Sequence, residues 1–274
     1  MAKRKRENNE KQNEKRIKEG RGQGDFENYK PWLKIQDVAS QGVVTRIKGV
    51  KSSRTHHTLS TLELDFLFLL DWSENIVEVK EQYPLDLNET TALAKEVDLI
   101  HPPRSNPNRP IVITTDFLII IRHPLGTREI ARTVKYSSDL TDSRVLEKFE
   151  IERLFWLERN IDWGIVTELD INKTVVQNIR WLYKHRSLNS LPNSVNAELI
   201  SPMSDFMLPA LKAKQLALRT ITKKCDEHFS LASGSSLSIV RYLLAIRQWQ
   251  VNMFIPIQPG KPLALITADG GKEI

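Results

Sequence analysis

A long run of β-branched residues, interrupted by a single loop, most restricts what this chain can fold into. Residues 111–121 (IVITTDFLIII) are rich in Ile, Val and Thr, and the pattern resumes over residues 129–135 (EIARTVK). The intervening residues 122–128 carry the Pro and Gly that are typical of a turn. The sequence therefore predicts a β-hairpin over residues 111–136, folded about Leu125 and Gly126.

This hairpin places two charged side chains opposite each other. Folding about Leu125 and Gly126 pairs Asp116 with Lys135, and cross-strand partners lie roughly 5 Å apart on one face of an antiparallel pair. Thr133 shares the face of Lys135, and the side chain of Val134 points away. The pair has two interpretations: an ordinary surface ion pair, or part of a site for a metal ion and a phosphate.

A third candidate, Glu63, lies in a segment that reads as a buried helix. Residues 58–72 are apolar nearly all round, and Ser60 or Thr58 is available as the N-cap. Glu63 should therefore lie among Leu and Phe side chains, where a charged carboxylate is strongly disfavoured without a partner. That partner is either a Lys, an Arg or a backbone N–H in a purely structural role, or a cation bound in a site.

The chemistry that this trio suggests is metal-dependent phosphoryl transfer. Asp116 and Glu63 are expected to hold one or two Mg²⁺ ions, for which Mn²⁺ should substitute, together with the backbone carbonyl of Val134. Such ions polarise a scissile phosphate and orient a water molecule. Lys135 would then stabilise the negative charge of the transition state.

The chain is long enough, at 274 residues, for two domains with separate cores. Residues 1–24 are almost entirely polar and predict a disordered basic arm. We expect a catalytic domain over residues 25–170, where helices and strands form an α/β unit around a small mixed sheet. The elements expected there are a strand over 75–80 and helices over 90–100 and 143–158.

From residue 171 to residue 274 the pattern is mainly helical. Helices are expected over 174–183, 205–228 and 236–247, followed by two short strands over 250–255 and 263–266. Helices followed by a terminal hairpin outline a winged-helix domain that binds DNA or a partner. Arg241, Arg247 and Lys261 lie on the last helix and its wing, where they either contact DNA or form a solvated basic face.

The charge distribution supports a polyanionic partner. Residues 26–172 contain 23 acidic and 18 basic side chains, whereas residues 173–274 contain 13 basic and six acidic ones. A basic region suits DNA, because each neutralised phosphate releases condensed counterions. An acidic centre suits divalent cations.

Composition also excludes several classes of protein. The apolar runs are too short to span a bilayer, no apolar stretch follows the basic first residues, and Cys225 is the one cysteine. A membrane protein, a secretory signal, an internal disulfide and a Cys-based zinc site are therefore not expected, and the expected location is the bacterial cytoplasm. The adjacent His56 and His57 read as a loop entering a helix rather than as metal ligands.

Taken as a group, these residues resemble the TnsA endonuclease family of heteromeric, Tn7-like cut-and-paste transposons. The resemblance runs over roughly residues 30 to 265 and rests on four segments, namely STLE (60–63), EVKEQYP (78–84), TDF (115–117) and TVK (133–135). It implies a restriction-endonuclease-like catalytic domain and a winged-helix C-terminal domain. One position departs from the family pattern, because Thr133 stands where Gln or Glu is preferred.

The resemblance also implies a specific role. Glu63, Asp116 and Lys135 match the catalytic residues of a family that nicks the 5′ ends of the transposon, on the non-transferred strand of double-stranded DNA. Members work with a DDE-type recombinase, which cuts the 3′ ends, and with an AAA+ ATPase regulator. Two other readings remain open: a stand-alone restriction-type nuclease, and a non-catalytic DNA-binding assembly factor.

Overall fold

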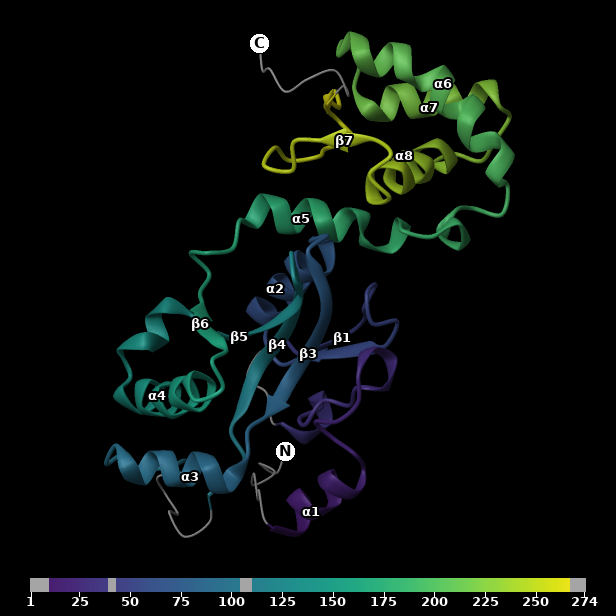
Figure 1. Cartoon of the computed structure of the whole chain (residues 1–274). Helices are drawn as coiled ribbons and strands as arrows, with labels where there is room; N and C mark the ends of the chain where they lie inside the picture. The colour runs from purple at the N-terminus through teal and green to yellow at the C-terminus, as the bar shows by residue number, and fades with distance from the viewer. Residues whose placement is uncertain (1–9, 39–42, 104–109, 267–274) are drawn as a thin grey trace, which may run out of the picture. The chain divides into compact units, whose positions relative to one another are not determined.

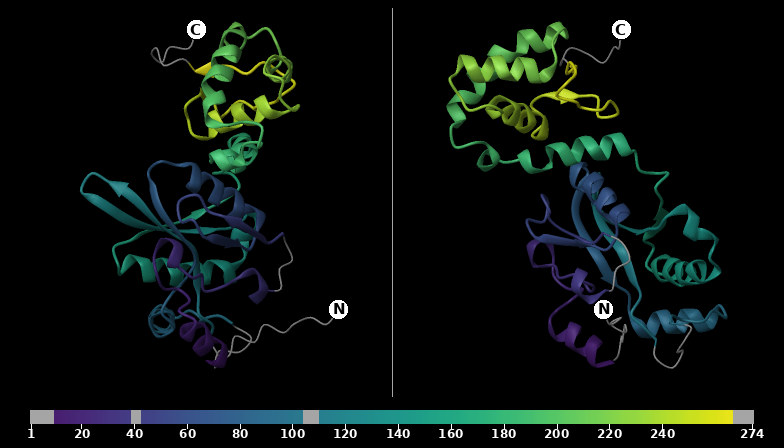
Figure 2. Two further views of the ribbon diagram at one scale, coloured as in Figure 1. Left: turned by 90° about the vertical axis from the view of Figure 1, so that its right-hand side faces the viewer. Right: turned by 180° about the vertical axis from the view of Figure 1, so that it is seen from behind.

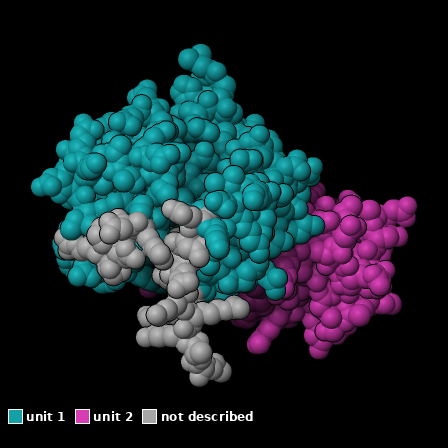
Figure 3. Space-filling model, turned by 90° about the horizontal axis from the view of Figure 1, so that it is seen from below, with its two compact units in different colours: residues 1–171 teal, residues 172–274 magenta. Residues whose placement is uncertain are grey.

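The computed structural model describes residues 10–38, 43–103 and 110–266. Its contacts divide the chain into two compact units, residues 1–171 and residues 172–274 (Figure 3). In the described part of the chain, no helix is long and apolar enough to cross a membrane. The fold is mixed α/β, and its four-stranded sheet lies in the first unit (Figure 1).

The first unit is built on a four-stranded mixed sheet in the order β3-β4-β5-β6. Strands β3 (Ile76–Pro84), β4 (Thr114–His123) and β5 (Gly126–Val134) are antiparallel to one another, and β6 (Asp162–Val166) runs parallel to β5. The sequence predicts the first three strands but not β6. A separate pair, β1 (Thr45–Lys48) with β2 (Thr55–Thr58), lies near β3.

The hairpin has a different register from the one that the sequence predicts. His123 pairs with Gly126, so the turn is Pro124–Leu125, and Pro is favoured there because its φ is fixed near the value that a turn requires. Phe117 consequently pairs with Arg132, which brings Asp116 to the level of Thr133. The predicted pairing of Asp116 with Lys135 is therefore wrong by two residues.

Helices cover both faces of this sheet (Figure 2). On one face lies α2 (Thr61–Trp72), whose Phe66 meets Phe117 of β4 edge to face, with ring centroids 5.6 Å apart. The other face carries α3 (Leu87–Glu96) and α4 (Ser143–Leu157). Their shared core with the sheet contains Leu93, Leu118, Ala131, Ile151, Phe155 and Trp156.

Strand β3 changes face at Gln82. Residues two apart in a regular strand share a face, yet Glu81 bonds Arg54 on the α2 side while Tyr83 packs on Trp156 of α4. Gln82 has a left-handed backbone with φ 51°, which is uncommon for a residue with a side chain. This local reversal sets Gln82 apart from the ladder, because the pairing passes from Glu81 directly to Tyr83.

The predicted disorder of the N-terminal arm is wrong for its described part. Residues Glu10–Lys18 form α1, and Arg16 and Arg21 are buried. Arg16 lies over the ring of Trp32, and Arg21 pairs with Asp37 at 2.5 Å. Polar composition hides such packing, because long cationic side chains bury their stems and stack on aromatic rings. Residues 1–9 lie outside the described residues.

The second unit is mainly helical, as the sequence predicts. Its helices are α5 (Lys173–Leu182), α6 (Ala197–Ala213), α7 (Leu218–His228) and α8 (Ser235–Ala245), and the short strands β7 (Gln250–Val251) and β8 (Leu265–Ile266) form an antiparallel pair. The single helix predicted over 205–228 is wrong. The chain breaks at Lys214, which caps α6 with a left-handed backbone.

Several short 3₁₀ turns connect these elements. They lie at Phe26–Asn28, Ile35–Asp37, Ser137–Thr141, Tyr183–His185 and Leu188–Ser190.

Candidate active site

The start of α2 positions Glu63. Ser60 is the N-cap, and its hydroxyl accepts a hydrogen bond from the Glu63 N–H at 3.1 Å. The Glu63 carboxylate in turn accepts from the Leu59 N–H at 2.8 Å through Oε2. The Glu63 carboxylate thus reaches back to the residue before the N-cap, and the two bonds hold both the helix end and the carboxylate. Glu63 is 7% exposed, and the Leu59 N–H that bonds this buried acid carries no charge.

Gln82 links Glu63 to Asp116. Its side-chain Nε2 donates to Asp116 Oδ1 at 3.2 Å and to Glu63 Oε2 at 3.4 Å. Its Oε1 accepts from the Thr114 hydroxyl at 3.2 Å. One amide therefore brings together carboxylates that lie 53 residues apart in the sequence.

The end of β5 holds the other oxygen of Asp116. The Val134 N–H donates to Asp116 Oδ2 at 2.7 Å. A residue in an extended strand directs its N–H and C=O toward the same neighbour, so the Val134 carbonyl is also directed toward the side on which Asp116 lies. The structure thus brings Glu63, Asp116 and the Val134 backbone to one place.

Lys135 does not join this group in the structure. Its ammonium lies 3.1 Å from Asp139 Oδ2, in an ion pair whose side chains are 36% and 46% exposed. The correction follows from the two-residue change in hairpin register, which ends β5 at Val134 and leaves Lys135 beyond the last strand pair.

A second buried acid lies close to the site, and the sequence reading misses it. Glu152 of α4 is fully buried, and its Oε1 accepts from Thr115 at 2.7 Å and from the Thr133 hydroxyl. The Thr133 hydroxyl thus donates to Glu152 and not to Glu63 or Asp116. Lys148, one helical turn earlier, lies 4.0 Å from Glu152. The i, i+4 spacing of these charges on an otherwise apolar helix face is the signal that could have found them.

Both carboxylates of the central group are disfavoured as anions. Burial, followed by the nearby charge of Asp116, raises the pKa of Glu63 to about 8. Burial also raises the pKa of Asp116, to about 6, against the opposing charge of Lys148. A bound cation would favour the ionised form of both carboxylates and so offset the cost of charging two neighbouring buried acids.

The donor set fits a hard divalent cation. The Asp116 oxygens each accept one N–H, which leaves each a lone pair, and the Leu59 N–H and the Gln82 amide both bond to Oε2 of Glu63. In the same part of the chain, no three His, Cys, Asp or Glu side chains converge as a metal cluster. Mg²⁺ tolerates such a set, because it commonly takes one or two carboxylates and keeps several waters.

These pKa shifts predict how the stability of the metal-free protein depends on pH. A raised pKa in the folded state means that folding favours the protonated acids, so this contribution is complete at low pH and is lost as pH rises through about 6 to 8. In EDTA we expect the melting temperature to fall by several degrees from pH 5.5 to pH 8.5. Excess Mg²⁺ should reduce the fall, because it stabilises the ionised pair.

Differential scanning calorimetry across this pH range checks the expectation. Asp116→Asn serves as the control, because it removes one of the two acids and should flatten the pH dependence. An equal slope in the variant and the wild type would contradict the assignment of the pH dependence to this pair.

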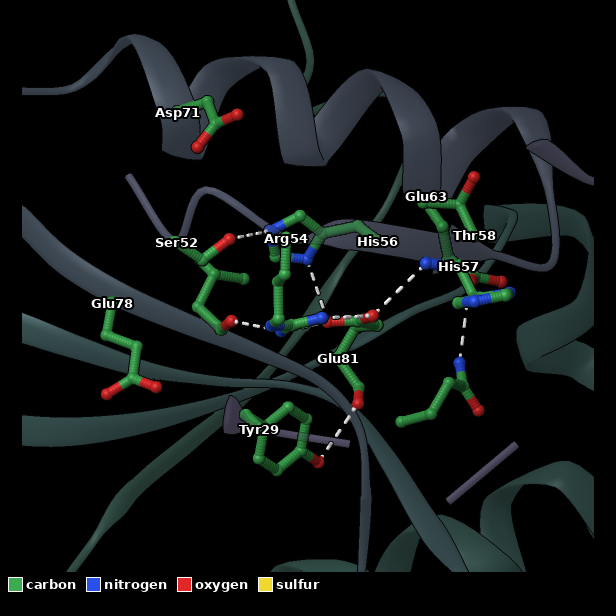
Figure 4. A network of polar contacts seen from close by, with 12 residues as sticks. Tyr29, Ser52, Arg54, His56, His57, Thr58, Glu63, Asp71, Glu78 and Glu81 are labelled. Carbon is green, nitrogen blue, oxygen red and sulfur yellow. Dashed lines mark hydrogen bonds and ion pairs between the residues drawn. The ribbon is translucent and has the colours of Figure 1, made fainter. Parts of the chain in front are cut away.

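A buried polar network surrounds Glu81, the residue before Gln82 on β3 (Figure 4). Glu81, next to Gln82 on β3, accepts from Arg54 at 2.5 and 2.8 Å, from His56 Nδ1 at 2.8 Å and from the His57 N–H at 3.1 Å. Burial raises the pKa of Glu81, but His56 and Arg54 outweigh burial and hold it well below its usual range. The His56 ring also contacts Ser52. His56 and His57 lie in strand β2, so the predicted loop at this position is wrong.

The three predicted DNA-contact residues lie in the second unit. The guanidinium carbon of Arg241, on α8, lies 4.4 Å from the centre of the Trp181 ring. Its Nη1 lies 3.4 Å from Nε2 of His185. Arg247 follows α8 in a left-handed conformation, and Lys261 is exposed between β7 and β8. Arg241 is thus committed to packing on Trp181, whereas Lys261 is open to a ligand.

Comparison with known proteins matches both halves of the chain. Residues 34–168 match the family model described as TnsA-like endonuclease N terminal, and residues 170–253 match the one described as TnsA endonuclease C terminal. A curated relative, the transposon Tn7 transposition protein TnsA of Escherichia coli, is 36% identical over 231 residues, which are 84% of this chain and 82% of the relative. Two matches that together span both units, and a relative aligned over most of both chains, show that this chain belongs to the TnsA endonuclease family.

Proposed function

We propose that this chain is the Mg²⁺-dependent endonuclease subunit of a transposase that cuts the 5′, non-transferred strand at transposon ends. The observation that carries the proposal is the pair of desolvated carboxylates, Glu63 and Asp116, joined by one amide beside the Val134 backbone. Membership of an endonuclease family supplies the reaction class. The strand choice comes from the family resemblance.

Each residue of the site has a distinct task in this proposal. Glu63, Asp116 and the Val134 carbonyl would hold one or two Mg²⁺ ions, with Mn²⁺ as a substitute. A bound cation of this kind supplies Lewis-acid polarisation of the phosphate and a more acidic water. The Val134 N–H and the Leu59 N–H hold the two carboxylates in place before any substrate arrives.

Lys135 is proposed to leave Asp139 and stabilise the charge that develops on the phosphate. The Lys135–Asp139 pair is partly exposed, and such pairs contribute only about 0 to 1 kcal/mol. Release of the ammonium is therefore inexpensive, and a nearby phosphate is a stronger partner than one surface carboxylate. Lys148 has a different task, since its charge favours the ionised form of Asp116.

Replacement of these two lysines separates their tasks. Lys135→Gln should lower strand cleavage by about 10²- to 10³-fold at every pH, because it removes charge stabilisation in the transition state. Lys148→Gln should instead move the onset of cleavage to higher pH, because the pKa of Asp116 rises further. Rates measured between pH 6 and pH 9 distinguish the two, and a fully active Lys135→Gln with an inactive Lys148→Gln would transfer the phosphate-facing task to Lys148.

The second unit is proposed to bind DNA or a partner as a winged-helix domain, with the β7–β8 hairpin as its wing. Lys261 is exposed on that hairpin, and Arg247 lies at the end of α8. Arg241 would contribute through its packing on Trp181 rather than as a free cation. In this proposal the partners are double-stranded transposon ends, a DDE-type recombinase and an AAA+ ATPase in the bacterial cytoplasm, and nicking waits for their assembly.

A further inference from the structure

The amide of Gln82 is the contact that Glu63 and Asp116 share, and nothing in the proposed chemistry yet requires it. Gln82 is 2% exposed and belongs to neither the hydrophobic core nor the regular strand ladder. A buried side-chain amide is costly unless other groups form hydrogen bonds with its NH₂ group and its oxygen. Its partners here are the two proposed metal ligands and a threonine.

The backbone of Gln82 is held in an unusual conformation. Its φ of 51° is in the left-handed region, where a side chain is disfavoured and glycine is not. The Trp32 N–H donates to the Gln82 carbonyl at 3.2 Å, so the N-terminal segment fixes this conformation. A left-handed residue that is not glycine needs a compensating contact, and its amide makes that contact.

The orientation of the amide is determined by its neighbours. The Thr114 hydroxyl donates to Oε1, which leaves the NH₂ group directed at Glu63 and Asp116. Ionised carboxylates only accept hydrogen bonds, so the reverse orientation would set an oxygen against two oxygens. The carboxylates therefore determine which end of Gln82 faces them, and the Thr114 hydroxyl, which can donate or accept, holds the other end.

A neutral donor is chemically suited to this position. A Lys or Arg between the acids would neutralise them and compete with a cation, whereas an amide orients both carboxylates and leaves their negative charge intact. Together, Gln82, the Val134 N–H and the Leu59 N–H hold the pair with neutral donors alone.

We propose that Gln82 is a positioning residue that sets Glu63 and Asp116 at the orientation in which they bind a divalent cation. This inference rests on the proposed metal-dependent function of the same two acids. It predicts that removal of the amide weakens metal binding even where the fold becomes no less stable.

Two variants of Gln82 test this in the full chain. Gln82→Met keeps the length of the side chain and removes its hydrogen bonds, and Gln82→Gly removes the amide but also relieves the left-handed backbone. Isothermal titration with Mn²⁺ should show binding about 10- to 100-fold weaker in both, the range typical for loss of a partner that orients a metal ligand. Thr114→Val, which frees the amide to rotate, should show a smaller loss.

Cleavage of a transposon end by the complete assembly supplies a second readout. Both variants should need a higher Mg²⁺ concentration for half-maximal cleavage, with much of the rate recovered at saturating Mg²⁺. A merely structural Gln82 predicts the opposite pattern: a lower melting temperature in Gln82→Met, recovery in Gln82→Gly, and unchanged Mn²⁺ affinity in both. That pattern would overturn the inference.

Asp116→Asn distinguishes failure of the inference from failure of the proposed function. If Asp116→Asn loses Mn²⁺ binding while both Gln82 variants bind as the wild type does, Gln82 has no positioning role and the metal site stands. If Asp116→Asn binds Mn²⁺ normally, the site itself is wrong, and the inference about Gln82 is overturned with it.

Discussion

Asp116→Ala should abolish nicking of the 5′ strand at a transposon end, by about a thousandfold or more, while the 3′ cuts made by the recombinase persist. The variant removes a carboxylate that meets Gln82 and the Val134 N–H, and with it a ligand for the cation that stabilises the scissile phosphate. The measurement is strand-resolved cleavage of a labelled transposon end with Mg²⁺, recombinase and ATPase present.

The matched control is Asp162→Ala. Asp162 lies on β6 of the same sheet, is paired with Arg132 at 2.7 Å and is 60% exposed, so its loss should leave both cuts intact. Persistence of both cuts in Asp116→Ala would favour the assembly-factor reading. Strong cleavage of plasmid DNA by the wild-type chain alone would favour a stand-alone nuclease.

The second large effect concerns stability rather than chemistry. Glu81→Gln should lower the free energy of unfolding by about 3 to 5 kcal/mol, because it leaves the Arg54 charge buried without its carboxylate. In a unit of this size the melting temperature should fall by about 10 °C. Thermal unfolding followed by circular dichroism measures both, and Arg54→Met should have a similar effect from the other side of the pair.

A double variant and an exposed pair control this expectation. Arg54→Met with Glu81→Gln should be less destabilised than the sum of the single variants, since neither charge is then left alone. Asp162→Asn, which breaks the exposed pair with Arg132, should cost about 1 kcal/mol or less. A Glu81→Gln variant no less stable than Asp162→Asn would show that the network does not depend on its charge.

Local signals in the sequence predicted several elements of the first unit, among them α2, the β4–β5 hairpin and α4. The helix expected over residues 58–72 is α2, and its N-cap is Ser60, one of the two residues proposed. Apolar periodicity and a capping residue act within one turn of chain, so their physics is visible in a short window. Strand β6 was missed because a strand of five half-exposed residues carries little of either signal.

The structure places two of the three predicted site residues close together, and the position of the third differs for a physical reason. Glu63 and Asp116 meet as expected, but Lys135 does not, because one proline sets the turn and the turn sets the register of every pair above it. The linking role of Gln82 depends on a left-handed backbone, on Thr114 and on the N-terminal segment. No local pattern encodes these two contacts with residues that are distant in the sequence.

The N-terminal segment has a practical consequence for anyone who handles this protein. By composition it resembles a dispensable tail, and trimming such tails is routine before crystallisation or fusion to a tag. Gly22, however, touches the strand end so closely that a single added carbon would lie 2.3 Å from Pro84, and Trp32 holds the carbonyl of Gln82. A protein shortened to residue 25 would keep Trp32 but lose the Gly22 contact with Pro84 and the packing of Arg16 and Arg21 against Trp32.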